Sequence, residues 1–360
     1  MAGDLLNLEA DVVELTRDIC DIESVSGNET ALANAIEAAL RKYSHLEVIR
    51  DGDAIVARTN LGRPSRVVIA GHIDTVPVAG NLPVQMLSME REQVLYGRGT
   101  VDMKAGVAVQ LKLAATISEP SSDVTYIFYD HEEVEASKNG LGRLAKNHPE
   151  LLDASFAVLC EPTSAEVEGG CNGTMRVELN FKGVKAHSAR PWMGKNAIHD
   201  AAAALATLAA YVPAEEEVDG LVYRESLNAV LIKGGIATNV IPDDCTITVN
   251  YRFAPSKSGA QAEAHLREVF AAADLSVVDV AEGARPGLDR PEAVAFLAAT
   301  KSQARPKYGW TDVARFSALG IPAVNFGPGD PSKAHADDEA VPVSQIYACE
   351  NALRAWLSVG

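Results

Sequence analysis

The sequence has little of what stabilises or targets secreted and membrane proteins. Its five cysteines are odd in number, widely separated and without any C-x-x-C pair, so they argue against a disulfide framework and favour a reducing compartment. No segment approaches the roughly 18 consecutive apolar residues of a membrane span. The N-terminal segment MAGDLLNLEADVVELTRDIC is acidic where a signal peptide is basic. We therefore expect a cytoplasmic protein that begins with an amphipathic helix.

Positive charge is also scarce. The chain has 32 basic against 49 acidic residues, and its formal net charge is -17. A charge of this sign repels nucleic acid and anionic lipid, so we expect neither nucleic acid nor a membrane as a partner. A small anionic substrate would need local arginines or a metal ion that overrides the general field.

The length and the order of sequence patterns predict two domains. The 360 residues exceed the size at which single hydrophobic cores usually stop growing. Strand-like runs such as VVIAGHID, VTYIFYDHEE and FAVLCEP alternate with helical patterns such as MKAGVAVQLKLAATI, and this alternation returns near the C-terminus. It predicts an α/β domain with a mostly parallel sheet sandwiched by helices, formed by residues 1–174 and 287–360.

The intervening residues 175–286 have a different pattern. MRVELNFKG and TITVNYRF alternate apolar and polar residues, and Ala-rich helices are expected at about 196–212 and 259–274. Two strand, helix, strand units predict a four-stranded antiparallel sheet with two helices on one face. We therefore expect an inserted α+β domain of the ferredoxin-like type.

Residues of the types that bind metals lie where the predicted parallel strands end, the edge at which open α/β sheets place their ligands. His72 and Asp74 are two residues apart, so both side chains lie on one face of their strand; one can bind a metal while the other orients the imidazole. Asp102 lies in a Gly-rich turn before a helix, where an ionised carboxylate is favoured. The other candidates are Glu132 and Glu133 after YIFY, Glu161 at the end of FAVLCEP, and His335 in the polar loop AHADDE.

Each of these residues alone has an ordinary structural interpretation. A histidine at a strand end is more often structural, adjacent glutamates are commonly solvated, and Asp102 could simply cap the following helix. Together, two histidines and several carboxylates without a nearby cysteine suit zinc, with cobalt or manganese as substitutes. Two metals with a shared water are a standard hydrolytic arrangement.

The motifs GHIDTVP, GRGTVDMKAG, the Glu-Glu pair, CEPT and AHADDE resemble, in order and spacing, those of the M20 family of zinc aminoacylases and exopeptidases. The resemblance covers essentially the whole chain. It implies that His72, Asp102 and Glu161 hold one zinc ion and that Asp102, Glu133 and His335 hold the other. The chain departs from the family at one point, because His131 precedes Glu132 and Glu133 where the family usually has an aspartate.

The resemblance also implies the roles of further residues. Glu132 is expected to be the general base and later the proton donor, with Asp74 as the partner of His72. His187, in KAHSARP, is expected to stabilise the oxyanion in the active site of a partner subunit, so the insert would act as a lid and dimerisation domain in a homodimer. The expected substrate contacts are Arg252, Asn239, Thr311 and Gly327.

Two segments of the insert resemble those of succinyl-diaminopimelate desuccinylases and acetylornithine deacetylases, GVKAHSARPWMGKNAI and GGIATNVIPDDCTITVNYRF. The resemblance implies hydrolysis of the N-acyl amide of a small amino acid, with N-succinyl-LL-2,6-diaminopimelate as the favoured substrate. The alternatives are an acetylornithine deacetylase, another aminoacylase or dipeptidase of the family, or a non-catalytic binding protein of the same fold.

Overall fold

The structure is a computed structural model that describes residues 6–89 and 92–358. The chain forms two compact units, of which the first comprises Met1–Gly169, Gly287–Arg305 and Arg315–Gly360, and the second comprises Gly170–Pro286 and Pro306–Ala314. Each unit has its own hydrophobic core. The first expected helix occurs as α1 (Val12–Cys20), and the part of that expectation on residues 1–5 lies outside the described residues.

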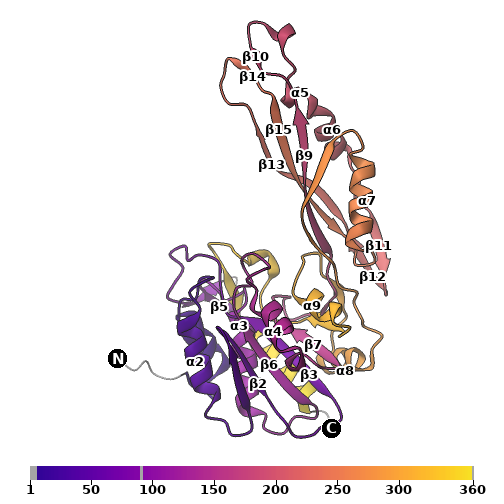
Figure 1. Cartoon of the computed structure of the whole chain (residues 1–360). Coiled ribbons are helices and arrows are strands. Elements are labelled where there is room, and N and C mark those ends of the chain that lie inside the picture. The colour runs from indigo at the N-terminus through magenta and orange to yellow at the C-terminus, as the bar shows by residue number, and fades with distance from the viewer. Residues whose placement is uncertain (1–5, 90–91, 359–360) are drawn as a thin grey trace. The chain divides into compact units, whose positions relative to one another are not determined.

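An eight-stranded sheet forms the centre of the first unit (Figure 1). The strands lie in the order β1 (Glu47–Asp51), β2 (Ala54–Arg58), β6 (Asp123–Tyr129), β3 (Arg66–His72), β7 (Phe156–Leu159), β18 (Ala323–Asn325), β8 (Glu168–Gly169) and β17 (Arg305–Pro306). The four neighbours β6, β3, β7 and β18 are parallel, as the sequence predicts, whereas β1 and β2 add an antiparallel edge.

Both faces of this sheet are covered. Val67 and Ile69 of β3 pack on one face, in a core shared with α1, α2 (Thr30–Leu40), α3 (Lys104–Thr116), α8 (Pro291–Thr300) and α10 (Val343–Ser358). Val68 and Ala70, which alternate with them, are fully buried on the other face. Burial on both faces explains why these strands are continuous apolar runs without alternation. The first unit also contains α4 (Gly140–Asn147), whereas α9 (Val313–Ala318) crosses the boundary between the two units at Ala314 and Arg315.

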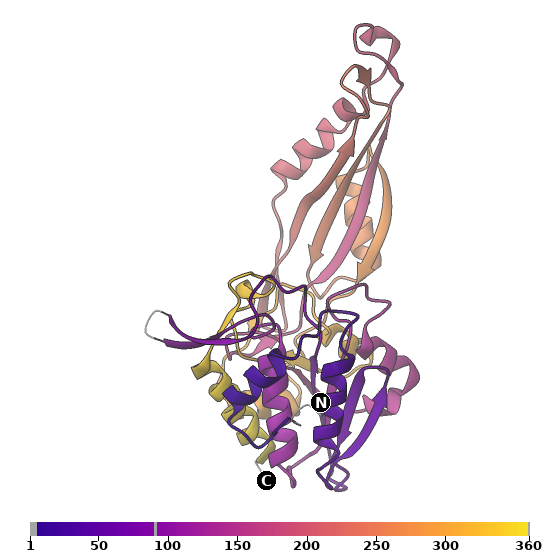
Figure 2. The ribbon, with the colours of Figure 1, turned by 90° about the vertical axis from the view of Figure 1, so that its left-hand side faces the viewer.

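A small antiparallel sheet of β19 (Ala340–Pro342), β5 (Glu92–Tyr96) and β4 (Gln85–Met89) completes the first unit. Figure 2 shows the β4–β5 hairpin extending away from the body of this unit. Short 3-10 helices occur at Pro149–Leu151 and Pro331–Lys333. None of the helices within 6–89 and 92–358 is long and apolar enough to cross a membrane.

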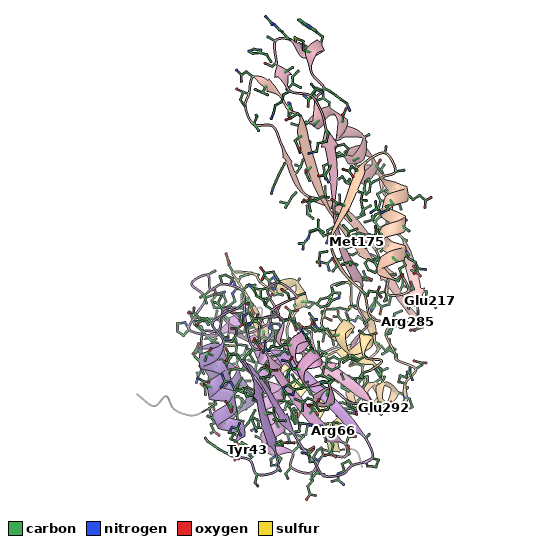
Figure 3. All side chains as sticks on the ribbon, viewed as in Figure 1. Tyr43, Arg66, Met175, Glu217, Arg285 and Glu292 are labelled. Carbon is green, nitrogen blue, oxygen red and sulfur yellow. The ribbon has the colours of Figure 1, made fainter. Side chains whose placement is uncertain are left out.

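The second unit is an antiparallel sheet with helices on one face. Its strands lie in the order β13 (Ser226–Gly234), β15 (Asp244–Phe253), β9 (Gly173–Lys182) and β16 (Asp274–Ala281). Buried side chains such as Met175, labelled in Figure 3, pack with α5 (Ala197–Asp200), α6 (Ala202–Ala210) and α7 (Gly259–Val269). The helix expected at 196–212 is thus divided at Ala201, and α7 ends earlier than expected. Two small hairpins, β10 (Ala186–His187) with β14 (Val240–Ile241) and β11 (Glu215–Val218) with β12 (Leu221–Arg224), and a 3-10 helix at Pro191–Met193 complete this unit.

Candidate metal centre

The carboxyl ends of three neighbouring parallel strands bring the candidate ligands to one edge of the sheet. His72 is the last residue of β3 and pairs in register with Tyr129, the last residue of β6. Glu133 lies in the turn directly after β6. On the other side of β3, Ala70 pairs with Leu159 of β7, and Glu161 follows two residues later. Strand register therefore places these three segments beside one another.

Asp102 lies between two histidines from distant segments. Its Oδ1 is 3.1 Å from His72 Nε2, and its Oδ2 is 3.4 Å from His335 Nε2. The two oxygens of one carboxylate thus face different imidazoles. The capping interpretation of Asp102 does not apply, because the N-cap of α3 is Met103 and no side chain caps that helix. The arrangement is suited to a carboxylate that bridges two cations.

Glu133 completes this group. Ligand atoms of His72, Asp102 and Glu133 all lie within 4.8 Å of one another. Glu133 Oε2 is also 2.9 Å from His335 Nε2. The side chains of His72, Asp102 and Glu133 are 1%, 12% and 7% exposed, so their charges lie in a region where water screens poorly.

The electrostatics of the group favour a bound cation. Asp102 and then Glu133, through hydrogen bonds, raise the pKa of His335 to about 10. Burial opposes protonation of His72, yet Asp102 and Asp74 raise its pKa well above the usual range. Burial likewise opposes ionisation of Asp102, but hydrogen bonds from His335 and His72 hold its pKa well below the usual value. A cluster that attracts protons this strongly has the donor set and charge of a metal site.

Asp74 connects β3 to the turn that carries both glutamates. Its buried carboxylate lies 3.4 Å from His72 Nδ1. It also accepts hydrogen bonds from the amides of Glu132 (3.0 Å) and Glu133 (3.1 Å) and from the hydroxyl of Ser26 (2.6 Å). Burial would raise the pKa of Asp74, but His72, Ser26 and the Glu132 amide lower it to about 2. Asp74 therefore stays ionised and fixes both the imidazole and the turn.

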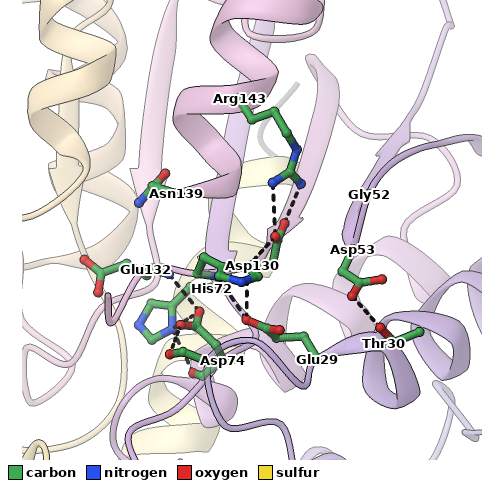
Figure 4. A network of polar contacts seen from close by, with 12 residues as sticks. Glu29, Thr30, Gly52, Asp53, His72, Asp74, Asp130, Glu132, Asn139 and Arg143 are labelled. Carbon is green, nitrogen blue, oxygen red and sulfur yellow. Dashed lines mark hydrogen bonds and ion pairs between the residues drawn. The ribbon is translucent and has the colours of Figure 1, made fainter. Parts of the chain in front are cut away.

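A network of charged side chains also holds the turn that carries Glu132 and Glu133 (Figure 4). His131 has a φ of 59°, in the left-handed region that histidine adopts only occasionally. Its Nδ1 lies 2.7 Å from Asp130 and 3.2 Å from Glu29, and Arg143 forms two hydrogen bonds to the Asp130 carboxylate. The departure at His131 therefore places an imidazole between two carboxylates beside Glu132.

Glu161 is 6% exposed, and Gly327 packs against the backbone of Cys160 and Glu161. A Cβ at Gly327 would overlap the carbonyl oxygens of Cys160 and Glu161. Only glycine allows this close approach of the two backbones. The Gly327 amide and carbonyl also bond to Thr163. Gly327 thus supports the backbone of Glu161.

Comparison with known proteins places this geometry in a family. The sequence pattern of peptidase family M20/M25/M40 matches residues 68–358. The chain belongs to that family. It is 51% identical over 356 residues to a putative succinyl-diaminopimelate desuccinylase of Mycobacterium tuberculosis, covering 98% of this chain and 99% of the relative. It is 45% identical over 364 residues to a succinyl-diaminopimelate desuccinylase of Corynebacterium glutamicum, covering 98% of both chains.

Solved structures share the fold. A tripeptidase from Staphylococcus aureus has a TM-score of 0.79 at 21% identity, with 98% of both chains covered. A dinuclear metal-binding peptidase of the M20 family from Bacillus subtilis has a TM-score of 0.70 at 16% identity, with 97% of both chains covered. The predicted family and α/β fold class are thereby confirmed.

The second unit of this M20 family member holds the other predicted residues. His187 and Asn239 lie close together, since the Ser188 amide bonds to the Asn239 carbonyl between β10 and β14. Arg252 lies on β15, where its Nε donates to Asn250 Oδ1 at 3.2 Å. Thr311 is buried, and its carbonyl accepts from the Cys171 thiol and the Ala314 amide.

Two buried charged residues beside the metal group are not among those selected from the sequence. Glu339 accepts hydrogen bonds from the amides of Val101 and Asp102, and it forms an ion pair with Arg98. Glu339 ends the segment AHADDE, which also contains Asp337 and Asp338. Those two side chains are 87% and 66% exposed, and nothing in the sequence distinguishes the buried carboxylate from its exposed neighbours.

Proposed function

We propose that the chain hydrolyses N-succinyl-LL-2,6-diaminopimelate to succinate and LL-diaminopimelate. The observation that carries the proposal is the 45–51% identity, over 98% of this chain, to relatives named as succinyl-diaminopimelate desuccinylases. The clustered histidines and carboxylates support a metal-dependent hydrolysis over a binding role, because the proposed ligands and the glutamate beside them are all present. We also propose that the reaction takes place in the cytoplasm.

The proposed cofactor is a pair of Zn²⁺ ions. His72, Asp102 and Glu161 would hold one ion, and Asp102, Glu133 and His335 the other. The separation of the Asp102 oxygens between His72 and His335 supports the bridging role. When bound, such a metal pair polarises an amide carbonyl and lowers the pKa of a coordinated water.

The proton transfers belong to Glu132. We propose that its carboxylate accepts a proton from the attacking water and returns it to the amine that leaves as the C–N bond breaks. Asp74 accepts a hydrogen bond from the Glu132 amide and so fixes the backbone of the residue that carries the proposed base. His187 of the partner subunit would donate a hydrogen bond to the oxyanion, and Arg252 would bind a substrate carboxylate through its guanidinium. Asn239 and Thr311 are proposed as further substrate contacts.

A substrate panel tests this function. Purified protein with zinc should hydrolyse N-succinyl-LL-2,6-diaminopimelate faster than acetylornithine or simple dipeptides. Glu132→Gln should abolish turnover while zinc binding stays unchanged. Preference for acetylornithine or a dipeptide would replace the substrate assignment, and no hydrolysis of any member would favour a binding protein.

The second unit offers a surface for the proposed homodimer. β13 lies at the edge of its sheet, and within the described residues it pairs only with β15. Val230, Leu231 and Ile232 on this strand are each more than 50% exposed. An apolar strand edge of this kind is a template for pairing with a second chain. We propose that two copies pair through β13.

Two measurements test the dimer. Leu231→Lys on β13 should shift the protein from dimer to monomer in sedimentation equilibrium, whereas Val278→Lys on the opposite edge strand, at a similar exposure, should not. Mixing His187→Ala with Glu132→Gln subunits should restore activity if His187 acts across the dimer. Activity that stays absent in confirmed mixed dimers would contradict that role.

A further inference from the structure

We propose that Glu339, with Arg98 as its partner, is a positioning residue that fixes the two segments carrying Asp102 and His335. The inference rests on the proposed function in one respect: it takes Asp102 and His335 as ligands of the metal pair. It assigns a role to a buried ion pair that is not among the proposed metal ligands or substrate contacts.

Glu339 holds the Asp102 turn at both of its ends. Its side-chain Oε1 accepts from the amides of Val101 at 2.8 Å and Asp102 at 3.0 Å. Its backbone carbonyl accepts from the amide of Gly97 at 3.0 Å. Because Glu339 lies four residues after His335 on the same segment, these bonds join the bridging carboxylate's backbone directly to the segment of the second histidine.

Arg98 joins a third segment to this arrangement. Its Nη1 lies 2.8 Å from Glu339 Oε2 and 3.2 Å from the carbonyl of Ala336, the residue after His335. Its Nε donates to the carbonyl of Pro77, three residues after Asp74, at 3.1 Å. One guanidinium therefore connects the segments that follow Asp74 and His335 to the turn that precedes Asp102.

Stability alone does not account for this pair. Arg98 and Glu339 are 3% and 1% exposed at their side chains, and replacing such a buried ion pair by packed apolar residues is often neutral or stabilising. A planar guanidinium and a carboxylate do, however, fix the directions of several backbone groups at once. Within the described residues, the side-chain hydrogen bonds of the pair end on segments that carry His335, Asp102 or Asp74. Positioning these ligand-bearing segments is the function that this geometry supports.

The second unit supplies a matched control. Glu225 is also a buried glutamate that accepts a backbone amide, from Ala254 at 2.8 Å, and pairs with a cation, Lys257, at 2.6 Å. It belongs to the other compact unit, and its carboxylate also accepts a hydrogen bond from the Tyr251 hydroxyl. Glu225→Gln should therefore destabilise the fold in the same chemical way without affecting the metal ligands.

The experiment is a Co²⁺ titration of metal-free full-length protein, followed by the visible absorption of the bound ion. We expect Glu339→Gln to weaken Co²⁺ binding by about 10–100-fold and to change the spectrum, the effect usual for partners of metal ligands. Glu225→Gln should leave both unchanged. If Glu339→Gln does not fold, Arg98→Lys provides the test, because its single ammonium keeps the charge but cannot make all the bonds of the guanidinium.

Unchanged Co²⁺ affinity and spectrum in a folded Glu339→Gln or Arg98→Lys protein would overturn the inference and leave a purely structural ion pair. The titration uses no substrate, so its result is separate from that of the substrate panel. A protein that fails to hydrolyse succinyl-diaminopimelate but loses Co²⁺ affinity on Glu339→Gln would refute the proposed substrate and support the positioning role.

Discussion

Asp74→Asn tests how much the residues that hold the metal ligands in place contribute to activity, because it changes none of the proposed ligands. The Asp74 carboxylate accepts the amides of Glu132 and Glu133 on different oxygens and also accepts the Ser26 hydroxyl. Asparagine has the same shape but only one acceptor oxygen. Its amino group would therefore face one of the two backbone amides of the turn. Both groups are hydrogen-bond donors, so that amide would lose its acceptor.

The magnitude follows from these contacts. A buried amide left without an acceptor costs about 1–3 kcal/mol of unfolding free energy. The Ser26 hydroxyl can rotate to accept from the new amino group, so we expect no further cost there. His72 also loses its charged partner, and loss of such a partner commonly lowers metal affinity or activity by about 10–100-fold. We expect kcat to fall by about that factor, because the Glu132 turn loses a hydrogen bond and His72 loses the adjacent charge, although its Nδ1 keeps the Asp74 backbone carbonyl at 3.0 Å.

Ser26→Ala is the control for this prediction. It removes one hydrogen bond to the same carboxylate, with a stability loss of about 1.5–3 kcal/mol, but leaves both amides of the turn bonded. Urea unfolding should therefore report comparable losses for the two variants, whereas steady-state kinetics with saturating zinc should show a large fall in kcat only for Asp74→Asn. Wild-type kcat in a folded Asp74→Asn protein would refute the reasoning.

Two further predictions concern stability. The Asp123 carboxylate accepts hydrogen bonds from the amides of Leu61 and Arg63. Burial opposes its ionisation, but these bonds hold the pKa of Asp123 below its ordinary value. The contribution of Asp123 to the unfolding free energy is therefore present above about pH 4 and is lost as the pH falls through the lowered pKa of the folded state. Asp123→Asn should accordingly lower the unfolding free energy by about 1–3 kcal/mol near pH 6, with a smaller gap to wild type at pH 3.5 in urea unfolding; a gap independent of pH would contradict this. Gly327→Ala should destabilise the protein by about 1–3 kcal/mol in thermal unfolding, because the new Cβ meets two carbonyl oxygens. Gly309→Ala should have no such effect, because the space around its Cβ is open. Equal losses of stability in the two variants would refute the packing argument.

The sequence predicts the architecture of the first unit well because its signals are local. A parallel strand buried on both faces requires a continuous apolar run, and its polar residues can occur only where the run ends. VVIAGHID therefore indicates both β3 and the position of His72 at the sheet edge. The same reasoning places Glu133 after β6 and Glu161 after β7, although these residues are far apart in the sequence.

The support of the site could not be predicted in the same way. Glu339 differs from the exposed Asp337 and Asp338 only through its three-dimensional contacts with the distant Asp102 turn. His131 has no periodic or motif signal of its own, and its position between Asp130 and Glu29 depends on a left-handed backbone conformation. Such interactions join segments that are brought together only by the complete fold, so no local pattern in the sequence encodes them.

The division of the chain has a consequence for how substrate specificity arises in this family. The proposed metal ligands and Glu132 all belong to the first unit, whereas His187, Asn239, Arg252 and Thr311 all belong to the second. If the second unit supplies the groups that recognise the substrate, its surface can change while the carboxylates and imidazoles at the strand ends stay in place. Substitutions such as Arg252→Lys should then raise KM for the succinylated substrate without changing metal affinity, since none of the described contacts of Arg252 involves a metal ligand.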